Sequence, residues 1–138
     1  MGTTQKIFSI ILTSAIMFGL SYFWHMYALN DIDRPSFDMT YYYIFAPILH
    51  VCITLFIALV ISLDLMNFLF SNKILGSFFA GAFIGVVIYL IQLIFGISFN
   101  KDTTIAYITI DLLWQIIHKG TGGVILKLLY RRADRLNY

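Results

Sequence analysis

The sequence predicts an all-α protein, an integral membrane four-helix bundle with both termini in the cytoplasm. Of its 138 residues, 60% are hydrophobic and only 12% are charged, whereas a soluble domain carries about 25% charged residues. Each membrane-spanning helix needs roughly 20 apolar residues and a connection, so about four helices exhaust a chain of this length. We therefore expect one transmembrane domain that covers residues 1–138 and no separate soluble domain.

The first predicted span covers residues 7–29. It ends in a cluster of aromatic side chains, as expected where a helix meets the lipid headgroups. The polar, turn-rich segment at residues 30–38 follows, and it holds three acidic residues but only one arginine. We expect this segment to lie outside the membrane. The aromatic cluster consists of Tyr22, Phe23, Trp24 and Tyr27.

The second predicted span covers residues 43–70. Pro47 lies near its start, where a helix tolerates proline best. The apolar run is longer than one crossing requires, so the helix either tilts or breaks near residues 62–67. We favour the break, which places Asp64 near the headgroups rather than among acyl chains.

The third and fourth predicted spans cover residues 74–99 and 104–128. From Thr104 to His118 a helix rises only about 22 Å, which is less than the hydrocarbon core of about 30 Å. The fourth span must therefore continue past Lys119, and its polar residues lie within the membrane. A short basic tail completes the chain.

The basic residues near the helix ends predict the orientation. Arg131, Arg132 and Arg135 follow the fourth span, and Lys6 and Lys73 lie at the other helix ends of the same side. Cytoplasmic segments of membrane proteins carry an excess of lysine and arginine. We expect a multi-pass protein of the cell inner (plasma) membrane with both termini inside.

Polar residues recur at helical spacing in the fourth span. Asp111, Gln115 and His118 are spaced by four and three residues, which stacks them on one helix face. Gly122 extends that face, and Lys119 lies one step round from it. An ionisable side chain at the centre of a span costs at least about 2.5–3.5 kcal/mol. This polar stripe must face protein or water, and it serves either a proton or solute path or a structural hydrogen-bond network.

The third span offers a complementary face. Ser77, Gly81 and Gly85 form a track of small residues, which lets another backbone approach closely. Tyr89 and Gln92 continue the same face toward the outer half. The third and fourth helices are antiparallel neighbours, so we expect helix packing at the small residues and hydrogen bonds from Tyr89 and Gln92 to the Asp111 end.

Two further histidines, His25 and His50, lie near the acidic-loop side. A lone histidine in an apolar helix is more often a hydrogen-bonded packing residue than a ligand. The alternative is a second polar site or a haem held between two imidazoles at one depth on facing helices. The depths indicate that His118 lies apart from both, toward the cytoplasm.

Several function classes are excluded by what the chain lacks. Its net charge of +2 gives no electrostatic footprint for nucleic acid. It carries no zinc-type spacing, no phosphate-binding loop and no catalytic signature. The single cysteine, Cys52, cannot form an internal disulfide. We expect no metal site, no catalytic residue and no enzyme activity, and no cofactor unless the haem alternative holds.

The Gly85 to Tyr89 spacing, followed by Asp111 and Trp114, resembles the second half of a small bacterial family of four-helix membrane proteins with no assigned function. That family carries Gly-x-x-x-Tyr and later Asp-x-x-Trp at a similar separation. The resemblance covers the last two helices and implies a four-helix membrane fold.

The chain also departs from that family. Gln92 and Gly96 stand where the family has Tyr and Asn, and the His-Lys pair at residues 118–119 replaces an apolar continuation. The Trp-His pair at residues 24–25 is similar to the Trp-Tyr end of the first helix in another uncharacterised four-helix family. Neither resemblance implies a known activity.

Three functions are compatible with these patterns. The leading expectation is a small polytopic protein that acts as a homo-oligomer or as a subunit of a larger membrane complex, because four short helices can hardly enclose the polar stripe unaided. The first alternative is a proton-coupled small-solute carrier or channel in which Asp111 and His118 exchange protons. The second alternative is a haem or quinone membrane anchor. In each case the chain's immediate partner is the lipid bilayer.

Overall fold

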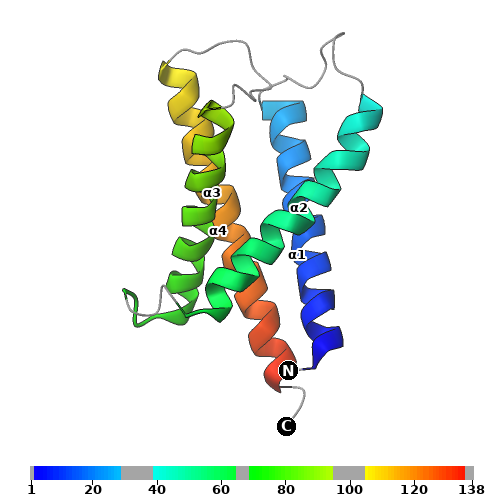
Figure 1. Cartoon of the computed structure of the whole chain (residues 1–138), viewed down its shortest axis with the longest axis vertical. Coiled ribbons are helices and arrows are strands. Elements are labelled where there is room, and N and C mark those ends of the chain that lie inside the picture. The colour runs from blue at the N-terminus through cyan, green and yellow to red at the C-terminus, as the bar shows by residue number, and fades with distance from the viewer. Residues whose placement is uncertain (1, 29–38, 65–68, 95–104, 136–138) are drawn as a thin grey trace.

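The computed structural model describes residues 2–28, 39–64, 69–94 and 105–135. Within these ranges the chain is helical and contains no strand. Four α-helices lie side by side, with both ends of the chain at the same end of the bundle (Figure 1). The all-α, four-helix prediction is confirmed. The helices are α1 (Thr3–Phe23), α2 (Met39–Ser62), α3 (Lys73–Ile94) and α4 (Ile105–Arg135).

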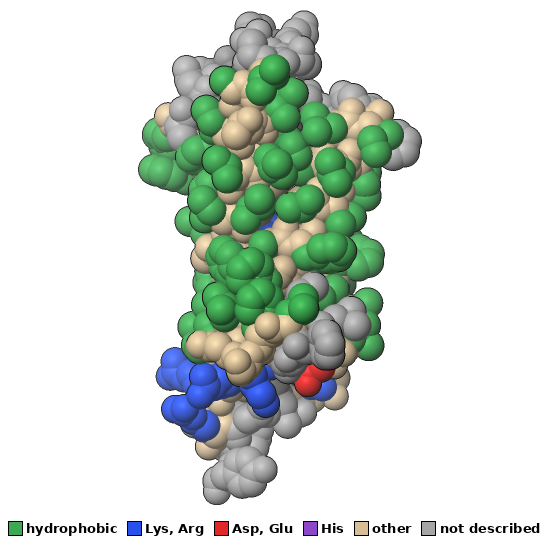
Figure 2. Space-filling view, turned by 90° about the vertical axis from the view of Figure 1, so that its left-hand side faces the viewer, with side chains coloured by type: hydrophobic (Ala, Val, Ile, Leu, Met, Phe, Trp, Pro, Cys, Tyr) green, Lys and Arg blue, Asp and Glu red, His purple; other side chains and the backbone are tan. Residues whose placement is uncertain are grey.

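Three segments are long and apolar enough to cross a membrane. They are Thr3–Tyr27, Thr40–Ser62 and Lys73–Ile94. The outer surface is covered by large apolar side chains, and Figure 2 shows them spread over the middle of one face. A soluble protein rarely exposes so much contiguous apolar surface, and these features fit a membrane protein. α4 is the longest helix, with 31 residues, and it carries the polar stripe.

α1 begins at Thr3, four residues earlier than the sequence predicts. The Gly2 backbone N–H donates a hydrogen bond of 3.3 Å to the Gln5 side chain, which stabilises the first turn. The helix then widens into a π-helical turn, η1 (Trp24–Ala28), a geometry that is often found at functional sites. The last residue of the predicted span, residue 29, lies outside the described residues.

α2 starts earlier than the predicted range of about residues 43–70, and it ends at the break that the sequence favours within that range. The helix starts at Met39, so Pro47 lies in its interior and removes one backbone donor there. It ends at Ser62, inside the stretch where the sequence favoured a break. Asp64 adopts a left-handed conformation, with φ 55°, and such a residue cannot continue a right-handed helix. Residues 65–68 lie outside the described residues.

α3 starts at Lys73, one residue before the predicted third span. The Asn72 side-chain oxygen accepts hydrogen bonds from the backbone N–H groups of Ile74, at 2.9 Å, and Leu75, at 3.4 Å, and so caps the helix. α4 continues to Arg135, so the expected end at residue 128 is wrong. After Gly123 the sequence contains neither glycine nor proline before the helix ends, so nothing interrupts it. Residues 95–104 lie outside the described residues.

Close backbone contact joins α3 to α4, the most extensive helix pair of the structure. A methyl group added to Gly81 would overlap the carbonyl oxygen of Lys119, and one added to Gly123 would overlap that of Ser77. Small residues at these crossings let the two backbones touch. α1 packs against α2 and α4 and completes the bundle.

The buried apolar cluster lies between the inner halves of the helices, on the termini side of the polar stripe. Its buried members come from all four helices and fix how these helices pack. The polar stripe therefore lies beside a packed core and not in an open channel. The cluster contains Met17, Ile53, Ile57, Ala58, Ile61, Ala80 and Leu126.

A buried polar cluster between the helices

The polar stripe of α4 divides between two neighbouring helices. Gln115 and Lys119 face α3, because a methyl group on Gly85 would come within 2.6 Å of the Gln115 carbonyl oxygen and 3.0 Å of Lys119 Cγ. Gly122 faces α1, where an added methyl group would overlap the Met17 sulfur. Successive residues of a helix point about 100° apart. Neighbouring positions of α4 can therefore contact α3 and α1 at the same time.

His118 and Lys119 form a hydrogen-bonded chain in the interior. The Lys119 ammonium donates to His118 Nδ1 at 2.9 Å. His118 Nε2 lies 2.8 Å from the Met17 carbonyl oxygen of α1. A carbonyl can only accept, so Nε2 carries the ring proton and Nδ1 offers its lone pair to the lysine. The exposed fractions are 1% for His118 and 4% for Lys119, so one chain alone buries both side chains.

His50 of α2 lies beside this chain. Its ring centroid is 5.7 Å from that of His118, at an interplanar angle of 57°. His50 Nδ1 donates to the Ala46 carbonyl oxygen at 2.7 Å, so its Nε2 carries the lone pair. That Nε2 is buried and has no hydrogen-bond partner among the described residues. His50 therefore offers an unused proton acceptor next to His118.

This proximity differs from the expectation that His50 and His118 lie at separate depths. α2 crosses the bundle obliquely (Figure 1), and its start at Met39 adds a turn before His50. Both effects carry His50 further into the bundle than a straight span from residue 43 would. His25, in η1, interacts electrostatically with both rings.

Two tryptophans cover the cluster on its other side. The Trp24 and Trp114 rings stack with centroids 4.2 Å apart and planes within 8°. Trp114 in turn stacks on the His118 ring, at 5.3 Å and 8°. Aromatic pairs of this kind contribute about 0.5–1.5 kcal/mol beyond the area that they bury. Trp114 precedes His118 by four residues, and this spacing was the available sequence signal for the contact.

Asp111 and Tyr89 lie at the outer end of the stripe. Asp111 is half-buried and interacts electrostatically with Lys119 and with Tyr89. The Tyr89 hydroxyl donates to the Ile108 carbonyl oxygen at 2.9 Å, which joins α3 to α4 one turn before Asp111. Gln92 is half-buried and makes no side-chain hydrogen bond to a described residue. The structure thus gives Tyr89, but not Gln92, the expected contact with α4.

The haem alternative needs free imidazole nitrogens on facing helices. The residues that the sequence assigns to this alternative are His25 and His50, and His50 keeps Nε2 available while its Nδ1 bonds a carbonyl oxygen. Across the described ranges, no group of three His, Cys, Asp or Glu side chains could hold a metal ion. The haem alternative at His25 and His50 therefore stays a prediction.

Comparison with known proteins finds no matching family model, no matching curated protein and no matching solved structure. The resemblance to small four-helix membrane families therefore stays a prediction. The function must be inferred from the chemistry of the site itself.

Proposed function

We propose that this chain is a multi-pass protein of the cell inner (plasma) membrane that conducts protons through its buried polar cluster. The carrying observation is the hydrogen bond from Lys119 to His118 beside the unused acceptor nitrogen of His50. An ionisable group inside a membrane span is costly, and its usual role is in an ion or proton pathway.

In this proposal α4 is the fourth span. Its charged residues would be costly in lipid. Lys119, however, faces α3, and only 4% of its surface is exposed. The apolar side chains Leu113 and Ile117 are exposed instead. The start of α1 with Lys6, the start of α3 with Lys73 and the end of α4 with its arginines lie at one end of the bundle (Figure 1). Figure 2 shows basic side chains gathered at one end, and this excess supports a cytoplasmic location for both termini.

The first proton transfer uses two atoms that are already joined by a hydrogen bond. The Lys119 ammonium releases a proton to His118 Nδ1, which gives a neutral amine and an imidazolium. The imidazolium passes a proton to His50 Nε2 after a rotation of its ring, because the two rings are neighbours and that nitrogen has no hydrogen-bond partner among the described residues. Asp111 takes up a proton from the solution on the outer side and passes it to the Lys119 amine, and the His50 imidazolium releases its extra proton to the solution on the inner side, which restores the starting state.

An oligomer is not needed to bury the polar stripe. The sequence-based preference for a homo-oligomer or a larger complex assumed that four helices cannot bury the stripe. One chain buries Gln115, His118 and Lys119. Association with other subunits stays a prediction, and the particle mass of the purified protein in mild detergent tests it.

Proton conduction is tested with the purified protein in liposomes that hold a trapped pH-sensitive dye. A valinomycin-imposed potassium diffusion potential, negative inside, drives protons inward. We expect the wild type to acidify the lumen faster than protein-free liposomes. Lys119→Met should lower the initial rate at least tenfold, because it removes the proton donor and keeps the side-chain length. Lys73→Met, an exposed lysine outside the cluster, should conduct like the wild type.

Two further variants conserve the shape of the replaced side chain, so that a loss of conduction can be distinguished from misfolding. Asp111→Asn keeps the shape of a half-buried side chain, and His118→Phe keeps a ring. Circular dichroism and size-exclusion chromatography verify that each variant folds. Wild-type rates equal to those of empty liposomes would refute the proposal, as would full conduction by folded Lys119→Met. A Soret band in the same preparation would favour the haem anchor instead.

A further inference from the structure

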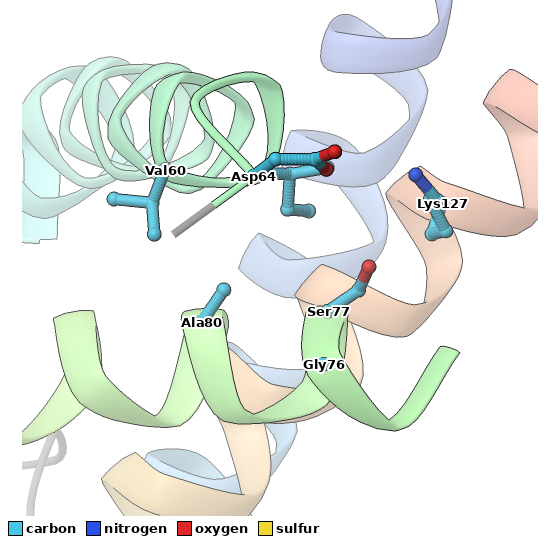
Figure 3. A pocket seen from close by; sticks show the side chains of 7 residues that line it. Val60, Asp64, Gly76, Ser77, Ala80 and Lys127 are labelled. Atoms are coloured by element: carbon cyan, nitrogen blue, oxygen red, sulfur yellow. The ribbon is translucent and has the colours of Figure 1, made fainter. Parts of the chain in front are cut away.

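A second polar site lies at the end of the bundle that holds both termini. It is a small cavity of about 10 Å³, which is enough room for one water-sized group. Three segments surround it, namely the end of α2, the start of α3 and the inner half of α4 (Figure 3). Its lining consists of Val60, Ile61, Asp64, Gly76, Ser77, Ala80 and Lys127.

Opposite charges meet in this cavity. Figure 3 shows the Asp64 carboxylate, the Lys127 ammonium and the Ser77 hydroxyl directed toward the space between the helices. The Ser77 hydroxyl donates its proton to the Lys73 carbonyl oxygen at 2.8 Å. Its lone pairs are therefore available to a donor in the cavity. A carboxylate and a hydroxyl oxygen thus form the accepting wall, and Lys127 forms the donating one.

The backbone holds Asp64 in this position. Its φ of 55° reverses the chain direction just after α2, a conformation that costs an L residue about 1 kcal/mol or more. Aspartate tolerates this conformation better than most residues, although glycine adopts it without cost.

The cavity lies at the level of the lipid headgroups in a membrane-inserted bundle. It sits where α2 ends and α3 begins, and the exposed apolar side chains of Leu59, Leu63 and Leu75 lie nearby in the chain. Lys127 is followed one turn later by the exposed Arg131. Figure 2 shows that basic side chains gather at this end, with an acidic side chain beside them.

The geometry points to a binding site for the headgroup of a phospholipid that carries a primary ammonium next to its phosphate, the phosphoethanolamine group. The ammonium is about the size of a water molecule and fits the cavity, where it donates to Asp64 and Ser77. The phosphate stays outside the cavity and pairs with Lys127 and Arg131. A trimethylammonium group has no N–H to donate to Asp64 or Ser77. The acyl chains follow the apolar side chains of α2 and α3.

The test measures which lipid stays on the full-length protein. Protein in detergent receives an equimolar mixture of dioleoyl lipids with ethanolamine, N-methylethanolamine, N,N-dimethylethanolamine, choline and glycerol headgroups. Native mass spectrometry then counts each bound lipid. We expect at least fivefold more ethanolamine than choline lipid, with binding that falls at each methylation.

Matched variants locate the site. Asp64→Asn should reduce the ethanolamine preference to less than twofold, because it removes the ammonium's counter-charge. Lys127→Met should weaken the binding of ethanolamine and glycerol lipids alike, whereas Lys6→Met, an exposed lysine at the same end, should not. Thermal unfolding of each variant verifies the fold. Equal retention of ethanolamine and choline lipids, or an unchanged preference in folded Asp64→Asn, would overturn the proposal. A preference for the glycerol lipid would show a merely basic surface and would overturn it too.

Discussion

The glycines of α3 and α4 show how single residues decide the packing of this bundle. Gly81 and Gly85 lie against the backbone of α4 at Lys119 and Gln115. Without side chains there, the two helices touch, and the polar side chains beside the contact are covered by the neighbouring helix. The same glycines therefore support both the helix pair and the burial of Lys119.

Replacing Gly81 with alanine tests this role. The added methyl group overlaps the Lys119 carbonyl oxygen, which belongs to the backbone and cannot rotate away. We expect a loss of about 1–3 kcal/mol in the free energy of unfolding, measured by titration with a denaturing detergent in mixed micelles.

Gly19→Ala is the matched control, because an added methyl group there meets no atom within 4 Å. That variant should keep its stability or gain up to about 1 kcal/mol, since alanine favours the helix. Equal stability of the two variants would contradict the close contact between α3 and α4.

At the scale of elements, Asp64 brings together two features just after the end of α2, a left-handed backbone conformation and a charged side chain. The left-handed Asp64 ends the helix and directs the carboxylate toward α3 and α4. Backbone conformation and side-chain charge can be separated by comparing two variants that both lack the carboxylate.

Asp64→Gly should be more stable than Asp64→Ala by about 1 kcal/mol. Both variants lose the charge, but only glycine adopts a φ of 55° without steric cost. The same detergent titration measures the difference. If the alanine variant were as stable as the glycine variant, the left-handed conformation at residue 64 would be wrong.

The number and type of the helices could be predicted from the sequence, but their ends could not. Composition and length already indicate four apolar helices, because lipid requires the backbone to bond within each segment. The ends depend on local features that hydropathy does not capture. Asn72 caps α3 through its side chain, and α4 continues through three arginines because nothing in that stretch breaks a helix.

The candidate site was partly predictable for a similar reason. Helical spacing correctly groups His118 and Lys119 on neighbouring faces of one helix. Their partners come from tertiary packing, which periodicity does not reveal. The Met17 carbonyl accepts from His118, although nothing in the sequence marks Met17. The approach of His50 depends on the oblique course of α2.

At the scale of the whole molecule, the even number of helices brings the two termini together (Figure 1). α1, α2 and α3 satisfy the length and hydropathy of membrane spans. For α4 to cross the membrane as well, its polar side chains must face other helices. The side of the membrane on which the C-terminal end of α4 lies therefore shows whether α4 crosses the membrane.

Single cysteines on a Cys52→Ser background test this topology. With four spans, Asn72→Cys and Arg135→Cys should react with a membrane-impermeant maleimide from the same side in oriented vesicles. Ser36→Cys should react only from the opposite side. Labelling of Arg135→Cys together with Ser36→Cys would show that α4 does not cross.

The tryptophan stack gives the molecule an optical property of its own. The chain has two tryptophans, and both belong to the stack that ends on His118. All indole fluorescence therefore originates within one short column of rings. An imidazolium quenches the emission of an adjacent indole more strongly than a neutral ring does, so the brightness of the unlabelled protein follows the charge on His118.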